Sequence, residues 1–174
     1  TDGGGIFNSA SSPTLVGCTF TNNNAQYGGG MANAQVSEPV LTDCLFEGNF
    51  SSSHGGGMHN NENSSPTLEN CTFTNNTAGY SGGGMYNNEW SNPTLTNCIF
   101  TSNLGSHYGG GMLNNNNSNP TIENCTFENN DGDYGGGLFN WHGSNPLLNN
   151  CIFSNNSSRE GGGVHNSESS PTLN

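Results

Sequence analysis

The chain has 174 residues, of which only 29% are hydrophobic and only 8% are charged. Asp and Glu number 13 against a single Arg159, so the net charge is −12. Binding to nucleic acid or to an anionic membrane surface needs several Lys and Arg, so we expect neither partner. No apolar run is long enough to span a membrane, and we expect no membrane insertion.

A repeat unit of about 27 residues recurs along the whole chain. Three markers define it, and each returns every 25 to 27 residues. The glycine triplets begin at Gly3, Gly28, Gly55, Gly82, Gly109, Gly135 and Gly161, and the prolines are Pro13, Pro39, Pro66, Pro93, Pro120, Pro146 and Pro171. The cysteines are Cys18, Cys44, Cys71, Cys98, Cys125 and Cys151. Blocks of constant length joined by short turns of variable length indicate the coils of a solenoid.

The first strand of each unit is expected directly after the glycines, as in G-G-G-M-Y-N at residues 82–87. Alternation along a strand points Met85 inward and Tyr86 outward. The inward column is aliphatic throughout: Ile6, Met31, Met58, Met85, Met112, Leu138 and Val164. The outward column reads Phe7, Ala32, His59, Tyr86, Leu113, Phe139 and His165.

A second and a third strand are expected in P-T-L-T-N-C-I-F at residues 93–100. Proline opens the second strand, where its missing N–H matters least, and Leu95 points inward. Only Gly, Asn or Asp precedes each cysteine, which predicts a left-handed bend between the two strands. Beyond the bend, Cys98 and Phe100 point inward. The phenylalanine column is Phe20, Phe46, Phe73, Phe100, Phe127 and Phe153.

These elements predict an all-β fold, a right-handed parallel β-helix with three short strands per coil and six to seven coils. Coils stacked at the strand spacing rise by roughly 4.8 Å each. Each coil buries its few apolar side chains against its neighbours, so a chain poor in hydrophobic residues still forms a continuous core.

The quoted motifs resemble known repeats. "GGGMYN" with "FTSN" and "FTNN" resembles the GG-aliphatic and F-x-x-N repeats of chlamydial polymorphic membrane proteins. The fuller unit "SSPTLENCTFTNNTA" resembles the right-handed β-helix repeats of large bacterial secreted and surface proteins, within the pectin-lyase-like superfold. The resemblance covers the whole chain and implies an extracellular or cell-surface location, but superfolds host many activities.

Three columns are interpreted as structural ladders. Asparagine amides can donate and accept along a stack, which predicts one ladder from Asn8 to Asn166 through Asn33, Asn60, Asn87, Asn114 and Asn140, and another from Asn23 to Asn156. N-glycosylation at Asn49 or Asn75 is the alternative. The phenylalanines are expected to stack, and the cysteines to be free buried thiols, with disulfides between adjacent coils or a metal as alternatives.

The chain is not expected to be an enzyme or to bind a cofactor or metal. The resemblance to pectate lyases would imply a basic catalytic residue and calcium-binding acids, yet the chain has one Arg and scattered acids. The histidines His54, His59, His107, His142 and His165 show no zinc or catalytic-triad spacing. The turn from Asn129 to Asp133 is the best candidate for calcium, with a plain solvated turn as the alternative.

The outward column of the first strand is the candidate binding face. It combines Phe7, His59, Tyr86, Leu113, Phe139 and His165 with the preceding residues Tyr27, Tyr80, Tyr108 and Tyr134. Outward residues of a solvated rod should be polar, so an exposed aromatic edge beside a flat glycine strip suggests an interaction surface. Stacking within the ladder, lateral protein packing and sugar stacking are the alternatives. Thr19, Thr21, Thr72 and Thr74 on the third strand suggest ice binding, but Leu45 and Ile99 interrupt that array.

The sequence therefore predicts one β-helix segment over residues 1–174, uncapped at both ends and part of a longer array or fibre. Its expected function is a fibre, stalk or adhesin of a secreted or surface protein. Its expected partner is a second copy, end to end and laterally. The rival hypothesis is carbohydrate binding or processing, with polysaccharide as partner and any catalytic residues outside the segment.

Overall fold

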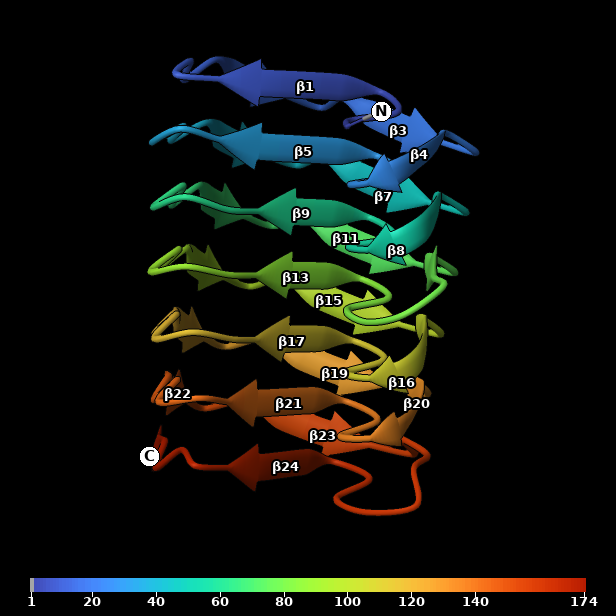
Figure 1. Ribbon diagram of the computed structural model, residues 1–174, viewed down its shortest axis with the longest axis vertical. Coiled ribbons are helices and arrows are strands. Elements are labelled where there is room, and N and C mark those ends of the chain that lie inside the picture. Colours follow the sequence, from blue (N-terminus) through green and yellow to red (C-terminus); the bar gives the residue numbers. More distant parts are fainter. Residues whose placement is uncertain (1) are drawn as a thin grey trace.

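The computed structural model describes residues 2–174, which wind as a right-handed parallel β-helix of stacked coils (Figure 1). All 25 strands of these residues fall into four parallel sheets that run the length of the solenoid. The fold class predicted from the sequence is confirmed. No helix in the described part of the chain is long and apolar enough to cross a membrane.

The first and second sheets each contain seven strands. The first sheet is built from β1 (Ile6–Ser9), β5 (Met31–Ala34), β9 (Met58–Asn60), β13 (Met85–Asn87), β17 (Met112–Asn114), β21 (Leu138–Trp141) and β24 (Val164–Ser167). The second is built from β2 (Thr14–Val16), β6 (Val40–Thr42), β10 (Thr67–Glu69), β14 (Thr94–Thr96), β18 (Thr121–Glu123), β22 (Leu147–Asn149) and β25 (Thr172–Leu173).

The third and fourth sheets contain six and five strands. The third is built from β3 (Thr19–Thr21), β7 (Leu45–Glu47), β11 (Thr72–Thr74), β15 (Ile99–Thr101), β19 (Thr126–Glu128) and β23 (Ile152–Ser154). The fourth is built from β4 (Asn24–Tyr27), β8 (Phe50–His54), β12 (Thr77–Ala78), β16 (Leu104–Tyr108) and β20 (Asp131–Tyr134).

Equivalent residues of successive coils pair with one another, so each column predicted from the sequence exists. Met85 pairs with Met58 on one side and Met112 on the other, and Leu95 pairs with Leu68 and Ile122. The inward columns form one continuous core that is fully buried in the middle coils and partly exposed at the two end coils. Phenylalanine rings stack along this core, with Phe46 and Phe73 at a centroid distance of 4.6 Å and an interplanar angle of 3°.

Both asparagine ladders form. In the first, Asn87 donates from Nδ2 to Asn114 Oδ1 at 2.8 Å and accepts the same bond from Asn60. In the second, Asn103 donates to Asn130 from both its backbone N–H and its Nδ2, at 3.0 Å. The second ladder also donates from Nδ2 to a phenylalanine carbonyl, as Asn103 does to Phe73 at 2.9 Å. Each ladder therefore satisfies amide groups that would otherwise be buried without partners.

All six cysteines are free thiols, and four of them are buried. Each sulfur lies near backbone carbonyl oxygens, as Cys98 Sγ does at 3.4 Å from Thr96 O. Burial raises the pKa of Cys44 and of Cys151. The thiols of these two residues therefore stay protonated at neutral pH, which makes them poor nucleophiles.

The predicted bends are confirmed, because every residue before a cysteine has a left-handed backbone. The φ values run from 50° at Asn150 to 61° at Gly17, with Asn97 at 53°. The expectation of three strands per coil is corrected, because the fourth sheet adds a strand that was missed. Its inward residues are small, namely Ala25, Ser51, Ala78, Gly105 and Gly132, and they are all buried. A column without large apolar side chains gives no hydrophobic periodicity.

This fourth strand explains why each coil carries three glycines, as Gly82–Gly84 illustrate. Gly82 has φ of +67°, which favours glycine. A Cβ on Gly83 would lie 2.5 Å from the carbonyl oxygen of Leu104 in β16, and a Cβ on Gly84 would lie 2.8 Å from the Phe100 ring. The expected flat, exposed glycine strip is therefore wrong, since these glycines are buried beneath the fourth strand and above a core ring.

The register of the second sheet generates a first prediction. We expect Leu95→Asp to lower the free energy of unfolding by about 4 kcal/mol or more, because Leu95 is fully buried and an unpaired charge is costly there. Thr94→Asp places the same charge on the neighbouring exposed residue, and we expect a loss of about 0.5 kcal/mol or less. Urea unfolding of the two variants measures both values. Equal losses would contradict the register.

Candidate functional site

Aromatic side chains gather where the end of the fourth sheet meets the first sheet. They come from two columns, which we call the aromatic ledge. The column at the fourth-strand ends contributes Tyr27, His54, Tyr108 and Tyr134, with Ser81 in register between His54 and Tyr108 and Tyr80 next to it. The outer column of the first sheet contributes His59, Tyr86, Leu113, Phe139 and His165.

The two columns interleave, because the aromatic side chains at the fourth-strand ends lie over first-sheet residues of the following coil. The His54 ring stacks on Tyr86 at 4.5 Å and 14°, and the Tyr108 ring stacks on Phe139 at 5.3 Å and 18°. Tyr27 makes the equivalent contact with His59 at 5.3 Å and 31°. Such offset ring pairs stabilise one another beyond the area that they bury.

This interleaving corrects the expected exposure of the outer column. Tyr86, Phe139 and Leu113 are only 7%, 3% and 1% exposed, and Ala32 is also buried. The unexpected fourth strand covers Tyr86 and Phe139 through His54 and Tyr108. The expected edge is open mainly at Phe7, which is 49% exposed, while His59 and His165 are half-buried. Within this column the structure shows ring contacts between His59 and Tyr86 and between Phe139 and His165.

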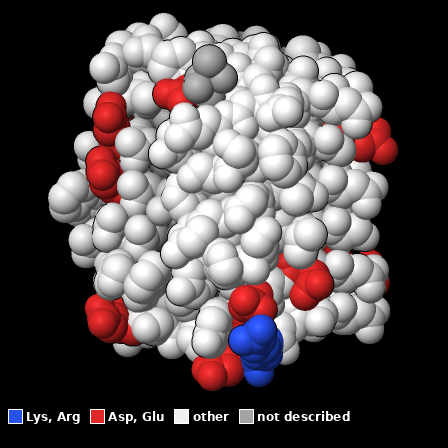
Figure 2. Space-filling model, turned by 45° about the vertical axis from the view of Figure 1, so that its right-hand side comes forward, with Lys and Arg blue, Asp and Glu red and all other residues white. Residues whose placement is uncertain are grey.

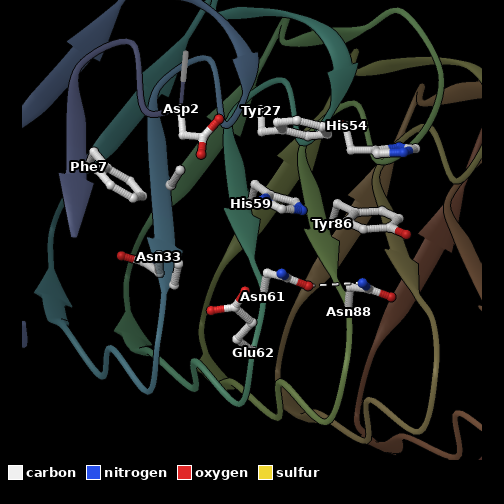
Figure 3. Close-up of a pocket in the computed structure, with 12 residues that line it drawn as sticks. Asp2, Phe7, Tyr27, Asn33, His54, His59, Asn61, Glu62, Tyr86 and Asn88 are labelled. Carbon is white, nitrogen blue, oxygen red and sulfur yellow. Dashed lines mark hydrogen bonds between the residues drawn. The ribbon is translucent and has the colours of Figure 1, made fainter. Parts of the chain in front are cut away.

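A groove of about 350 Å³ opens on the ledge near the N-terminal coils (Figure 3). The first-sheet residues Phe7, Ala32 and His59 pair in register, so Ala32 places a methyl group where the coils on either side carry rings. In the column above, Asp2 pairs with Tyr27 in a β-bridge and likewise carries no ring. The groove lies at a level where neither column carries a ring and the first-sheet residue contributes only a methyl group.

The walls of the groove are aromatic and its rim is polar. Figure 3 shows Phe7 on one side and His59 with Tyr86 on the other, with Tyr27 and Asp2 at the upper edge. Asn61, Glu62 and Asn88 form the lower edge, where Asn88 Nδ2 donates to Asn61 Oδ1 at 2.9 Å.

The two histidines of the groove are neutral. Burial, together with repulsion from His54, lowers the pKa of His59 to about 3. Burial also lowers the pKa of His54, whose Nδ1 is buried and has no hydrogen-bond partner within residues 2–174. The sequence showed no zinc or catalytic-triad spacing for His54 and His59, and in the structure both rings pack against Tyr86. Their positions, at a fourth-strand end and in the strand that follows it, could have revealed this contact.

The charges of the ledge are negative or absent. Figure 2 shows the corner between the first and fourth sheets as a broad surface without charge, with acidic atoms at its margins. The chain's single basic residue, Arg159, lies at the lower end, where its Nε is 3.4 Å from Asp133 Oδ1. The groove is therefore lined by the two carboxylates Asp2 and Glu62 and by no cation.

The candidate calcium turn from Asn129 to Asp133 leads into a β-strand. Asp131 and Asp133 lie in β20, and Asp133 also approaches His107 at 3.6 Å. In the part of the chain that the structure describes, no three His, Cys, Asp or Glu side chains come together as a metal site would require. His142 stacks on Trp141 and hydrogen-bonds Asn115, and His165 packs on Phe139. These contacts are structural.

Comparison with known families extends the resemblance noted in the sequence. Residues 1–108 match the family described as right handed beta helix region. Residues 150–167 match the repeat of the Chlamydia polymorphic membrane protein, and this stretch includes Phe153, Asn156 and the last glycine triplet. No curated protein and no solved structure matches the chain.

The depressed pKa of His59 generates a second prediction. Below about pH 6.5 the unfolded chain binds a proton at His59 that the folded chain does not bind until about pH 3. The free energy of unfolding therefore falls as the pH drops through this window, by up to about 1.4 kcal/mol per pH unit. His59→Tyr, which copies the residue of the next coil, should reduce this slope between pH 6.5 and about 5, a range above the carboxylate pKa values.

Urea unfolding at several pH values measures that slope. An unchanged slope in His59→Tyr would contradict the burial of a neutral His59.

Proposed function

Since the chain belongs to the right-handed β-helix region family, we propose that it is a non-enzymatic passenger segment of a secreted or cell-surface protein. In this role the segment is a stiff stalk that holds other parts of the protein away from the cell and presents its own flank for adhesion. The repeat match at residues 150–167, named for a polymorphic membrane protein, supports a surface location.

One observation carries the proposal, the unbroken continuity of the ladders. The chain of amide bonds from Asn8 to Asn166 passes through every coil of the solenoid without a gap, at 2.8 to 2.9 Å per step. A solenoid in which each coil is bonded to the next in the same way resists bending, because no coil boundary is weaker than the others. Stiffness along one axis is what a stalk requires.

The arrangement of the acids supports a role without catalysis. Glycoside hydrolysis and related chemistry need carboxylates gathered at one place. On the second sheet, Glu69 and Glu123 are separated by the intervening strand β14, where Thr96 occupies the equivalent position. Asp2 and Glu62 line one groove, and neither Lys nor Arg accompanies them there.

Carbohydrate binding is the second candidate function, but fewer aromatic rings are open to a sugar than the sequence suggested. Sugars stack on open ring faces, but Tyr86 and Phe139 are covered by His54 and Tyr108. The open rings on this flank are Phe7 and Tyr80, which are 49% and 44% exposed. A glycan array probed with the segment would favour this candidate if binding is lost in Phe7→Ala and Tyr80→Ala.

A surface role predicts where the protein is found. An antibody raised against the segment should label intact cells of the producing organism, and external protease should remove the signal without lysis. Permeabilised cells probed for a cytoplasmic enzyme provide the control for membrane integrity. Labelling that appears only after permeabilisation would overturn the proposal.

We also propose that the segment self-associates end to end. The strands of the first and last coils have one edge each without a partner inside residues 2–174, and a parallel edge of this kind pairs with any chain of matching register. In a longer protein a continuation of the same chain can fill that edge. For the isolated segment we propose that a second copy does so.

Sedimentation of the isolated segment tests this proposal at low and at high salt. End-to-end oligomers should persist at low salt, because they rest on backbone hydrogen bonds. Lateral bundles should increase with salt, which screens the net charge of −12 over roughly 10 Å at 0.1 M. A monomer under both conditions at high protein concentration would overturn self-association and leave the stalk role intact.

A further inference from the structure

We propose that the groove at Ala32 binds a quaternary ammonium group of the kind carried by choline, held between aromatic rings and two carboxylates. This inference is independent of the proposed surface role, because it rests on the shape and charge of one groove. The site is the groove of about 350 Å³ on the aromatic ledge, where Ala32 and Asp2 stand in place of aromatic residues.

The geometry of the slot suits a cation held between two rings. Phe7 and His59 belong to coils on either side of Ala32, so their backbones lie two strand spacings apart, or roughly 9.6 Å. Ala32 itself is buried, and a group held in the groove at its level, midway between the two coils, lies about 5 Å from the rings on both sides, which is within the range of roughly 6 Å for a cation–π contact. Tyr27 closes the upper edge of the same slot (Figure 3).

The charge of the slot favours a cation. Asp2 and Glu62 flank the slot on opposite edges, and no Lys or Arg lines it. The only basic residue of the chain, Arg159, lies in the loop after β23, near the opposite end of the solenoid, and is paired with Asp133. An anionic ligand would meet two carboxylates without a counter-charge, whereas a cation is attracted by both.

The two histidines beside the slot are uncharged. Because the pKa of His59 is lowered to about 3 and that of His54 is also lowered, both rings are uncharged at neutral pH. They therefore present aromatic faces to a cation and do not repel it. A quaternary ammonium suits such walls better than a metal ion, since it needs no coordinating ligands and its methyl groups bury apolar surface.

Amide chemical-shift titration by NMR with choline chloride tests the proposal on the whole chain. We expect shifts centred on Tyr27, Ala32 and His59. The uncharged isostere 3,3-dimethyl-1-butanol, which has the same shape, should bind at least about tenfold more weakly. Equal binding of the two compounds, or shifts elsewhere, would overturn the proposal, and binding of neutral sugars with no response to choline would replace it with carbohydrate recognition.

Two variants and one control sharpen the test. Ala32→Tyr fills the slot with a ring that the equivalent position already carries at Tyr86, so the fold should hold while binding is lost. Asp2→Asn with Glu62→Gln should weaken binding by about tenfold or more. Glu69→Gln with Glu123→Gln makes the same change of net charge on the second sheet and should leave the affinity unchanged. Undiminished binding in Ala32→Tyr would overturn the assignment.

Phosphatidylcholine vesicles distinguish the two sources of the group. Co-sedimentation with vesicles that free choline competes away would assign a lipid headgroup as the ligand. Binding of free choline without co-sedimentation would assign a soluble ligand to the same groove.

Discussion

Parallel in-register pairing of equivalent residues in neighbouring coils is the constraint on which everything else in this molecule depends. Met85 pairs with Met58 and Met112, and Asn87 pairs with Asn60 and Asn114. A side chain in such a column must therefore pack favourably against copies of itself in the coils on both sides. Side chains that satisfy that condition are few. Amides bond to amides and flat rings stack on flat rings, whereas like charges repel. The inward columns of Asn, Phe and Leu follow from this condition, as does a chain that is only 8% charged.

The same constraint fixes how the fourth strand is held. Its inward residues are too small to anchor it by apolar burial, so it depends on close backbone approach over the glycines. The Gly83 position admits the Leu104 carbonyl only because it has no side chain, while Gly84 admits the Phe100 ring from below. This approach carries His54 and Tyr108 over Tyr86 and Phe139. The glycine triplet, which the sequence suggested was an exposed strip, is therefore what allows the fourth strand to pack closely enough to cover the aromatic ledge.

These two modes of packing explain which parts of the structure could be read from the sequence. The core columns repeat large side chains at fixed intervals, so Leu95, Phe100 and the left-handed bend at Asn97 were predictable without coordinates. The fourth strand was not, because Ala78 and Gly105 carry almost no apolar signal. The exposure of Tyr86 was consequently misjudged, since alternation shows that it points out of the first sheet but not what lies above it. The groove escaped prediction for the same reason, and only Ala32, the smallest residue of its column, hinted at it.

The need for equivalent residues to pack on one another leaves few positions inside the columns free for function. Function is therefore best sought where a residue differs from the equivalent residues of the adjacent coils. A change inside the asparagine ladder strands a partner on each side, as would happen at Asn60 and Asn114 if Asn87 lost its amide, and each stranded group costs about 1–3 kcal/mol. A change in the outer column costs less, because Ala32, His59 and Leu113 all occupy equivalent positions in one regular sheet. Variation is therefore tolerated on the ledge and not in the ladder. The groove lies at such a variation, where Ala32 and Asp2 occupy positions that carry rings in most other coils. The stiffness of the solenoid and the chemistry of its flank can therefore change independently.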